Sequence, residues 1–133
     1  MILRICFSLA LLSTTTLADD APDCNNQVDQ NTMTQCANID FEKADAELNS
    51  VWRTAKKSAA DNDAEQPDDL KGLSEALLKT QRAWISYRDG QCEVAGFAFR
   101  GGSMEPTMVA QCLADMTKAR TKELQDFIDG PEQ

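Results

Sequence analysis

The side chains of this chain that could do chemistry or bind a ligand gather in residues 81–92, Q-R-A-W-I-S-Y-R-D-G-Q-C. This stretch holds a tryptophan, a tyrosine, two arginines, an aspartate and a cysteine, although only 6% of the chain is aromatic. The chain has no histidine, which removes the commonest general base at neutral pH. The stretch is therefore more consistent with a binding face or with the packing of a small domain than with a reactive centre.

Other routes to catalysis are also poorly supported. Ser103 lies in G-G-S-M-E, which is not the strand-to-helix turn of a nucleophilic serine. The 22 carboxylates make some close pairs inevitable, but none is singled out as a glycosidase-like pair. We predict a protein that is not an enzyme, with no catalytic residue and no cofactor. A peptidoglycan-active enzyme that uses carboxylates remains the least favoured alternative.

The first 18 residues, M-I-L-R-I-C-F-S-L-A-L-L-S-T-T-T-L-A, have the order of a secretory signal peptide. Arg4 supplies the positive start, about eight apolar residues follow, and small residues precede the expected cleavage after Ala18. The apolar run is too short to span a membrane. Cys6 is not placed like a lipoprotein cysteine. We therefore expect export to the periplasm or medium, without a lipid anchor, and one domain over residues 19–133.

The charge balance is strongly acidic. Loss of Arg4 with the leader changes the formal charge from −9 to −10. Such a surface disfavours nucleic acid and anionic lipid as partners and would speed the approach of a basic protein. Plain solubility is the alternative explanation, and we expect a monomer.

Four cysteines remain after the leader, an even number that is typical of disulfides in a small exported chain. Three connectivities are possible, and we favour the local pairs Cys24–Cys36 and Cys92–Cys112, each worth about 3 kcal/mol on the chain-entropy model. Zinc is disfavoured because no C-x-x-C pair and no histidine is present. The acidic run at residues 61–69 departs from an EF-hand, with Gln66 where glycine is required and Gly72 where glutamate is required. We therefore predict no metal site.

Helical periodicity extends over three segments. In residues 34–60 the apolar positions are spaced by three and four; the seam comprises Ala37, Phe41, Ala44, Leu48, Val51 and Ala55. The acidic segment 61–69 is expected to be a solvated turn. A second helix follows over about 69–95, with Gly90 as a weak point. A third covers about 106–128, with Pro106 in its first turn and Ser103 as a candidate cap. Its predicted seam comprises Val109, Leu113, Met116, Arg120, Leu124 and Phe127. We predict an all-α fold, a small antiparallel bundle of three long helices with two disulfides.

The second helix carries polar residues on the stripe that should face the core, namely Gln81 and Arg88. A buried arginine needs partners, so we predict that Arg88 reaches Asp45 on the first helix. Asn49 or Gln81 would complete the hydrogen bonds. Asp89 would then cap a helix or pair with another cation such as Arg120. The alternative is that Arg88 extends to solvent at the edge of the bundle. Trp84, on the same stripe, is expected to be core rather than ligand-binding.

The connection at residues 96–105, G-F-A-F-R-G-G-S-M-E, is the candidate contact surface. Phe97 and Phe99 have less reason to be buried in a glycine-rich loop than on a helical seam, and a disulfide between Cys92 and Cys112 would preorganise the loop for binding. The alternative is that the phenylalanines fold back and cap the bundle. The predicted partner-binding set comprises Phe97, Phe99, Arg100, Gly101, Gly102 and Ser103.

A family resemblance covers about residues 24–124. The segments C-N-N-Q-V-D-Q-N-T-M-T-Q-C-A, A-D-A-E-L-N, Q-R-A-W-I-S-Y-R-D-G-Q-C, G-G-S, Q-C-L and T-K-A-R-T-K-E-L follow one another as in the N-terminal domain of the LprI-like lysozyme inhibitor family. The resemblance implies a secreted or envelope helical domain of bacteria that inhibits lysozyme, a basic muramidase. The family's recurrent residues fall here on positions that look like scaffold: Asp45, Asn49, Gln81, Trp84, Arg88 and Asp89.

Together these observations favour a non-catalytic periplasmic or secreted protein that binds and inhibits lysozyme-type muramidases. The alternative is a generic envelope interaction module with an unknown partner.

Overall fold

The computed structural model describes residues 21–130, and no strand occurs in this range. The elements are α1 (Gln30–Glu65), η1 (Asp68–Leu70), α2 (Leu73–Gly96), η2 (Phe97–Phe99) and α3 (Glu105–Asp129), where η denotes a short 3-10 helix. The predicted all-α fold of three long helices is confirmed. The predicted signal peptide, including Arg4 and Cys6, lies outside the described residues.

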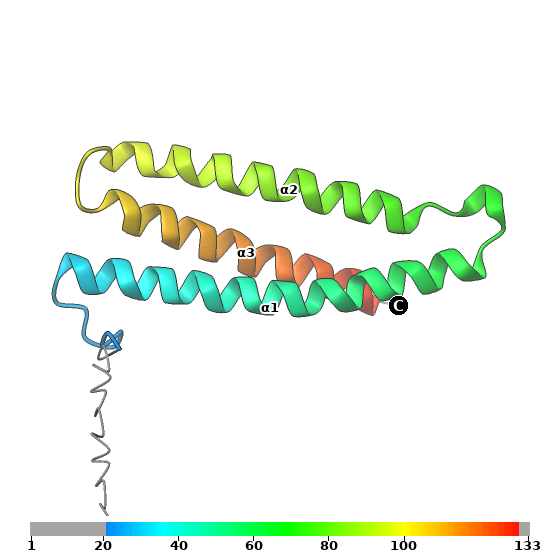
Figure 1. The fold of residues 1–133 in the computed structure, drawn as a ribbon, viewed down its shortest axis with the longest axis horizontal. Helices are drawn as coiled ribbons and strands as arrows, with labels where there is room; N and C mark the ends of the chain where they lie inside the picture. The colour runs from blue at the N-terminus through cyan, green and yellow to red at the C-terminus, as the bar shows by residue number, and fades with distance from the viewer. Residues whose placement is uncertain (1–20, 131–133) are drawn as a thin grey trace, which may run out of the picture.

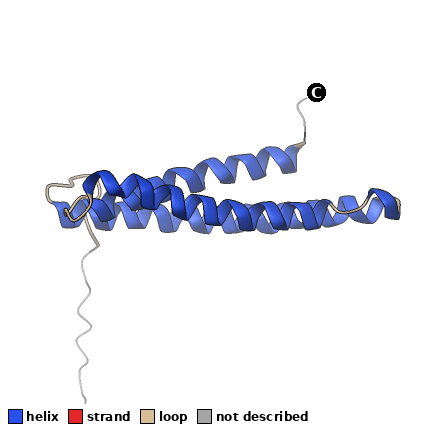
Figure 2. Cartoon of the chain, turned by 90° about the horizontal axis from the view of Figure 1, so that it is seen from above, coloured by secondary structure: helices blue, strands red, loops and turns tan. Residues whose placement is uncertain are grey.

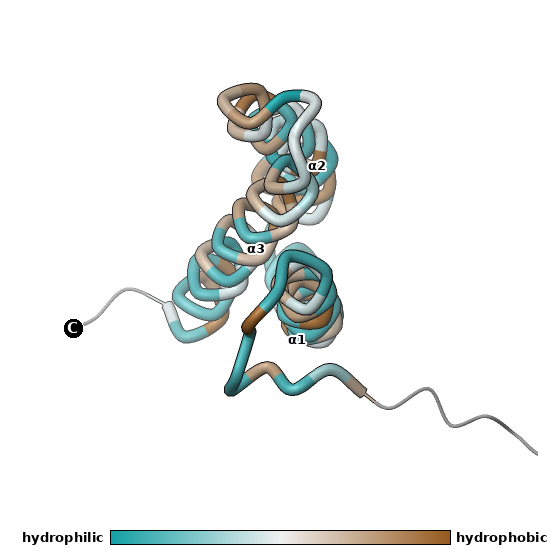
Figure 3. The backbone as a smooth tube through the Cα atoms, turned by 90° about the vertical axis from the view of Figure 1, so that its left-hand side faces the viewer, coloured by the Kyte–Doolittle hydropathy of each residue, from teal (hydrophilic) through white to brown (hydrophobic). Residues whose placement is uncertain are grey.

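The three helices lie side by side, and each runs antiparallel to the next in sequence (Figure 1). α1 has 36 residues, which corresponds to about 54 Å of helix. α3 starts between α1 and α2 (Figure 1) and inclines out of the plane of these two helices towards its end (Figure 2). Seen from the end of the bundle, α2 lies above α1, and α3 runs diagonally past them (Figure 3). The connection between α1 and α2 therefore projects beyond the end of α3.

α1 is longer at both ends than the predicted range 34–60. At its start, the Asp29 carboxylate accepts hydrogen bonds from the backbone N–H and the hydroxyl of Thr32, at 2.9 and 2.8 Å. Asp29 is therefore the N-cap, and α1 begins at Gln30, four residues before the predicted start. The two backbone and hydroxyl donors also hold the pKa of Asp29 below its usual value.

The far end of α1 extends into the acidic segment that was expected to be a turn, as far as Glu65, and Asp63 has a structural role there. Its carboxylate accepts the backbone N–H groups of Gly72, Leu73 and Ser74 at 2.9–3.0 Å. These N–H groups belong to the start of α2 and have no partner within the helix. α2 consequently begins at Leu73 rather than at Asp69.

α3 begins at Glu105, one residue before the predicted start, with a proline in its first turn as expected. Ser103 is not the cap. Met104 occupies that position without a side-chain hydrogen bond, and Glu105 instead reaches back to accept the N–H of Gly101 at 2.8 Å. α2 continues through Gly90 to Gly96 without interruption.

The core consists mostly of small residues. Leu48, Ala55 and Leu124 form its centre, with Trp52 and Trp84 packed against it. On α3 most buried positions lie on a row beside the predicted seam, namely Thr107, Ala110, Ala114, Thr117 and Thr121. Of the predicted seam itself, Arg120 and Leu124 are buried. Because α3 contacts both neighbours, small side chains let it approach them closely. The predicted residues Val109, Leu113 and Met116 are half-buried at the side of this row.

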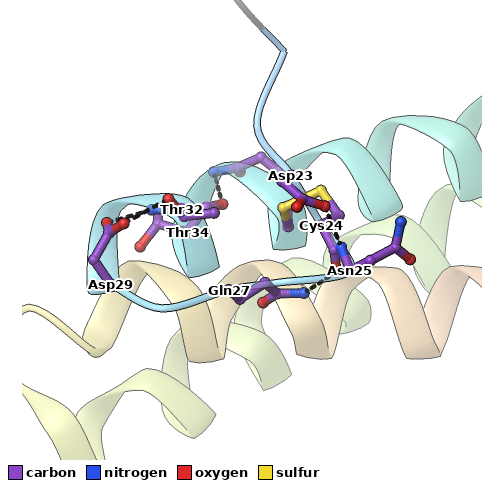
Figure 4. The surroundings of a disulfide bond; sticks show 9 residues. Asp23, Cys24, Asn25, Gln27, Asp29, Thr32 and Thr34 are labelled. Atoms are coloured by element: carbon purple, nitrogen blue, oxygen red, sulfur yellow. Dashed lines mark hydrogen bonds between the residues drawn. A yellow bond between two sulfur atoms is a disulfide. The ribbon is translucent and has the colours of Figure 1, made fainter.

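Both predicted disulfides are present, Cys24–Cys36 and Cys92–Cys112. The first joins the segment before α1 to the helix itself (Figure 4). Hydrogen bonds within this segment add to the bridge: Asp23 accepts the N–H of Asn25 at 3.1 Å, and the Gln27 amide donates to the carbonyl of Cys24 at 3.0 Å. The second bridge ties the end of α2 to α3.

Candidate functional site

The connection between α2 and α3 lies at one end of the bundle (Figure 1), and its aromatic side chains are exposed. Phe97 is 53% exposed and Phe99 is 39% exposed, so neither belongs to the buried core. The Arg100 guanidinium carbon lies 4.1 Å from the centroid of the Phe97 ring. A cation at this distance is attracted to the face of the ring. Phe97 and Arg100 therefore form one exposed unit with an apolar base and a charged top.

Hydrogen bonds hold the backbone of this connection in shape. The N–H of Arg100 donates to the carbonyl of Phe97 at 3.2 Å, and that of Gly102 to the carbonyl of Phe99 at 2.9 Å. Gly101 has a φ of +77°, a region that favours glycine, and its N–H is held by Glu105. Because each turn is closed by a bond, the connection needs little ordering when a partner binds.

The start of α1 lies at the same end of the bundle and is tied to the start of α3. The Gln30 amide donates to the Thr107 hydroxyl at 2.6 Å, and the hydroxyls of Thr34 and Thr107 are 2.7 Å apart. Thr107 is 1% exposed. These buried bonds and the two disulfides give the aromatic connection a rigid base.

A second polar cluster lies halfway along the bundle and centres on Arg88, which is 8% exposed. Its Nη1 is 3.5 Å from Asp45 Oδ1, the contact expected from helical phase. Asn49 donates to the other oxygen of Asp45 at 2.8 Å. The neighbouring Asp89 accepts a hydrogen bond from the Nε of Arg88 at 2.9 Å, and the buried Thr117 hydroxyl accepts one from Nη1 at 3.3 Å.

Of the two residues expected to complete the hydrogen bonds around Arg88 and Asp45, Asn49 does so, whereas Gln81 bonds elsewhere. Its Oε1 accepts a hydrogen bond from the Nε of Arg120 at 2.9 Å, and Arg120 pairs with Glu123 at 2.7 Å rather than with Asp89. Trp84 lies between the two arginines, with its ring centroid 5.2 Å from Arg88 and 5.9 Å from Arg120. Trp84 is thus a half-buried packing residue whose ring contacts the guanidinium groups of both arginines.

Sequence reasoning missed two members of this cluster, Thr117 and Phe41. The Phe41 ring centroid lies 5.3 Å from Arg88. Phe41 lies one turn before Asp45 on the same face of α1, so its place beside Arg88 could have been predicted together with that of Asp45. Thr117 had none, because it lies one position beside the predicted apolar seam of α3.

The buried polar groups of the bundle find their hydrogen-bond partners within the protein. No buried side-chain nitrogen or oxygen in residues 21–130 lacks a hydrogen-bond partner. No group of three residues in the described range could hold a metal ion. Groups with clearly shifted pKa values lie elsewhere: hydrogen bonds from the backbone of α2 lower the pKa of Asp63, and the contact with Asp40 raises the pKa of Lys118. Of the two clusters, the exposed aromatic connection is the one available to a partner.

Comparison with known proteins gives a family match over most of the chain. The model of the family described as "Lysozyme inhibitor LprI" matches residues 23–124. An uncharacterized protein of Rhizobium meliloti (strain 1021) is 48% identical over 114 residues, which is 84% of this chain and 82% of that protein. No solved structure matches.

Proposed function

Because the chain belongs to the LprI lysozyme inhibitor family, we propose that it binds lysozyme-type muramidases and blocks them without any chemistry of its own. Lysozyme inhibition is the property for which the family is named. The observation that supports a binding role here is the exposed Phe97–Arg100 unit on a rigid connection. We place the contact in residues 96–105.

The chemistry of the target fits such a unit. Glycosidases of the lysozyme type hold two carboxyl groups beside the bond they cleave. A guanidinium is well suited to pair with carboxylates, and Arg100 presents one on an aromatic base. The Phe97 and Phe99 rings supply apolar area for the walls of a sugar-binding cleft. We propose that Arg100 points towards the carboxylates while the rings fill the cleft entrance.

Overall charge supports association with a basic enzyme. The formal charge of −9 creates a field that attracts a cationic partner over distances comparable to the Debye length. Such steering raises the association rate, and faster association at an unchanged dissociation rate also tightens binding. Inhibition should therefore weaken when salt is raised from about 0.05 to about 0.5 M, and an unchanged potency would argue against steering.

The first experiment is a titration of the oxidised protein against a C-type lysozyme, with cell-wall lysis as the readout. Stoichiometric inhibition is expected. A protein that leaves lysis unchanged at micromolar excess would contradict the proposed function and favour an envelope interaction module with a different partner.

The contact is then mapped with paired variants. Phe97→Ala with Phe99→Ala should weaken inhibition by at least tenfold, since two aromatic anchors are lost. The matched control is Leu78→Ala with Ile85→Ala, which removes two side chains of α2 that are 39% and 40% exposed. Equal inhibitory potency of the two double variants would contradict the proposal that the aromatic connection contacts the enzyme.

We further propose that the protein is exported and works in the periplasm or medium. The predicted leader and the two disulfides support this compartment, since disulfides persist where conditions are oxidising. Among the helices of residues 21–130, none has the length and apolar character needed to cross a bilayer. A mass spectrum of the exported chain that starts elsewhere than near Asp19 would contradict the predicted cleavage.

A further inference from the structure

α2 carries a second stripe, beside the one that faces the core. It contains no charge, its members are spaced by four and three residues, and all of them are exposed: Ala76, Thr80, Ala83, Tyr87, Gly90 and Val94. Tyr87 is 61% exposed and Val94 is 64% exposed. Exposed apolar residues that occur singly need no explanation. Six uncharged positions at this spacing have the periodicity of a seam between two packed helices.

We propose that this stripe is the contact of an antiparallel homodimer in which α2 packs against α2 of a second copy. In a two-fold contact, each residue pairs with a fixed counterpart on the partner. An antiparallel pairing centred between Ala83 and Tyr87 sets each larger side chain opposite a small one. Tyr87 faces Ala83 of the partner subunit, Val94 faces the partner's Ala76, and Thr80 faces the partner's Gly90.

A hollow on the same side of the molecule supports this arrangement. It has a volume of about 270 Å³ and lies between the first half of α2 and the last turns of α3. Ala76 and Thr80 lie on its α2 side, and its apolar lining from the two helices includes Leu73, Leu77, Leu124 and Phe127. In the antiparallel pairing, Val94 of the partner subunit falls opposite Ala76, so this exposed side chain would enter the hollow of the other copy.

Charges that flank the stripe complement each other in the same register. Lys79, Ser86 and Glu93 follow the stripe on one side, and all three are exposed. Neither Lys79 nor Glu93 forms an ion pair with another residue in 21–130. In the antiparallel register Lys79 faces the partner's Glu93, and the reverse contact forms at the other end. Ser86 lies beside the two-fold axis and faces its own copy.

The contact is short. Six layers between residues 76 and 94 span about 27 Å of helix, and specific interfaces bury at least about 1,200 Å² in total. Each copy also carries a charge of −9, which opposes association. The expected dissociation constant is therefore on the order of micromolar. From composition alone a monomer is expected; the stripe emerges only when the structure fixes which face of α2 is buried.

Sedimentation equilibrium of the oxidised protein from about 1 to 500 μM tests the association. A monomer–dimer equilibrium is expected, and a monomer throughout would overturn the proposal. Tyr87→Glu should weaken the dimer by at least tenfold, whereas Ile85→Glu, on the opposite side of α2, should leave it unchanged. Circular dichroism checks that both variants fold; if Tyr87→Glu does not, Ala83→Gln replaces it.

Orientation is tested by single cysteines and by charge exchange. Ser86→Cys should give a disulfide-linked dimer, whereas Lys79→Cys should not, because in the antiparallel pairing its counterpart is far along the helix. Cross-linking of both variants would indicate a parallel pair and overturn the arrangement. Lys79→Glu should weaken the dimer, and the double variant Lys79→Glu with Glu93→Lys should restore it; no restoration would refute the register.

This dimer does not depend on the proposed inhibition. The stripe ends at Val94, before the aromatic connection begins at Phe97. Tyr87→Glu should therefore weaken the dimer while it leaves lysozyme inhibition per chain within about twofold. Loss of both would show that the two surfaces overlap and would overturn the separation stated here.

Discussion

The close approach of α2 to α3 can be tested at a single glycine. Gly96, the last residue of α2, is buried. A Cβ at this position would lie 2.6 Å from Cγ2 of Val109 and 3.5 Å from Cγ of Glu105, both on α3. Gly90, six residues earlier in the same helix, is exposed, and a Cβ there would meet nothing within 4 Å. The substitutions Gly96→Ala and Gly90→Ala therefore add the same methyl group to two different surroundings.

The expected magnitudes follow from these surroundings. Alanine in place of glycine inside a helix stabilises it by about 0.5–1 kcal/mol, and Gly90→Ala should show this gain. Gly96→Ala has at most the same gain, but it forces a valine methyl away from a packed position, which costs about 1–3 kcal/mol. The free energies of unfolding of the two variants should therefore differ by about 1–3 kcal/mol, in favour of Gly90→Ala.

Thermal unfolding of the oxidised protein, followed by circular dichroism at low micromolar concentration, measures this difference. For a chain of this length, 1 kcal/mol corresponds to roughly 4 °C in Tm, so the two variants should be separated by about 4–12 °C. Val109→Ala in the background of Gly96→Ala should recover part of the loss, because it removes the clashing methyl. Equal Tm values for Gly96→Ala and Gly90→Ala would show that α2 and α3 are not in contact at Gly96.

Three further outcomes are expected. Arg88→Met should lower the free energy of unfolding by about 1–3 kcal/mol, because it leaves buried and half-buried acceptors without their donor. Asp45→Asn should cost less than about 1 kcal/mol in urea denaturation, because this carboxylate is 42% exposed. The contribution of Asp63 to the free energy of unfolding should be complete above about pH 4 and fall as pH drops further, since the pKa of Asp63 is lower in the folded than in the unfolded chain. In urea titrations, Asp63→Asn should therefore differ from the wild type more at pH 7 than at pH 2.5. A difference that stays constant with pH would contradict this role. Replacement of Cys92 and Cys112 by serine should cost about 3 kcal/mol, and an unchanged urea midpoint would contradict it.

The exposure of the aromatic connection was predictable from the sequence, but the arrangement of its side chains was not. Aromatic residues in a glycine-rich connection between two helices are visible in the sequence, and so is the cysteine that follows the second helix's polar stripe. The stacking of Arg100 on Phe97 was not predictable, because it depends on the backbone turns that Gly101 and Glu105 close. Likewise, Ser103 looked like a helix cap, but the reach of Glu105 satisfies the backbone there instead.

The sequence by itself determined the three helices, since apolar periodicity is a local property of the chain, and it favoured the two local disulfides and the burial of Arg88. Tertiary structure decided which partners these residues meet. Helical phase identifies the face that a side chain occupies, but α3 packs against two helices, so phase alone could not assign Gln81 to Arg120 rather than to Arg88. Asp63 appeared to belong to a solvated turn because its role, the capping of α2 from the last turns of α1, arises only when the chain has folded back on itself.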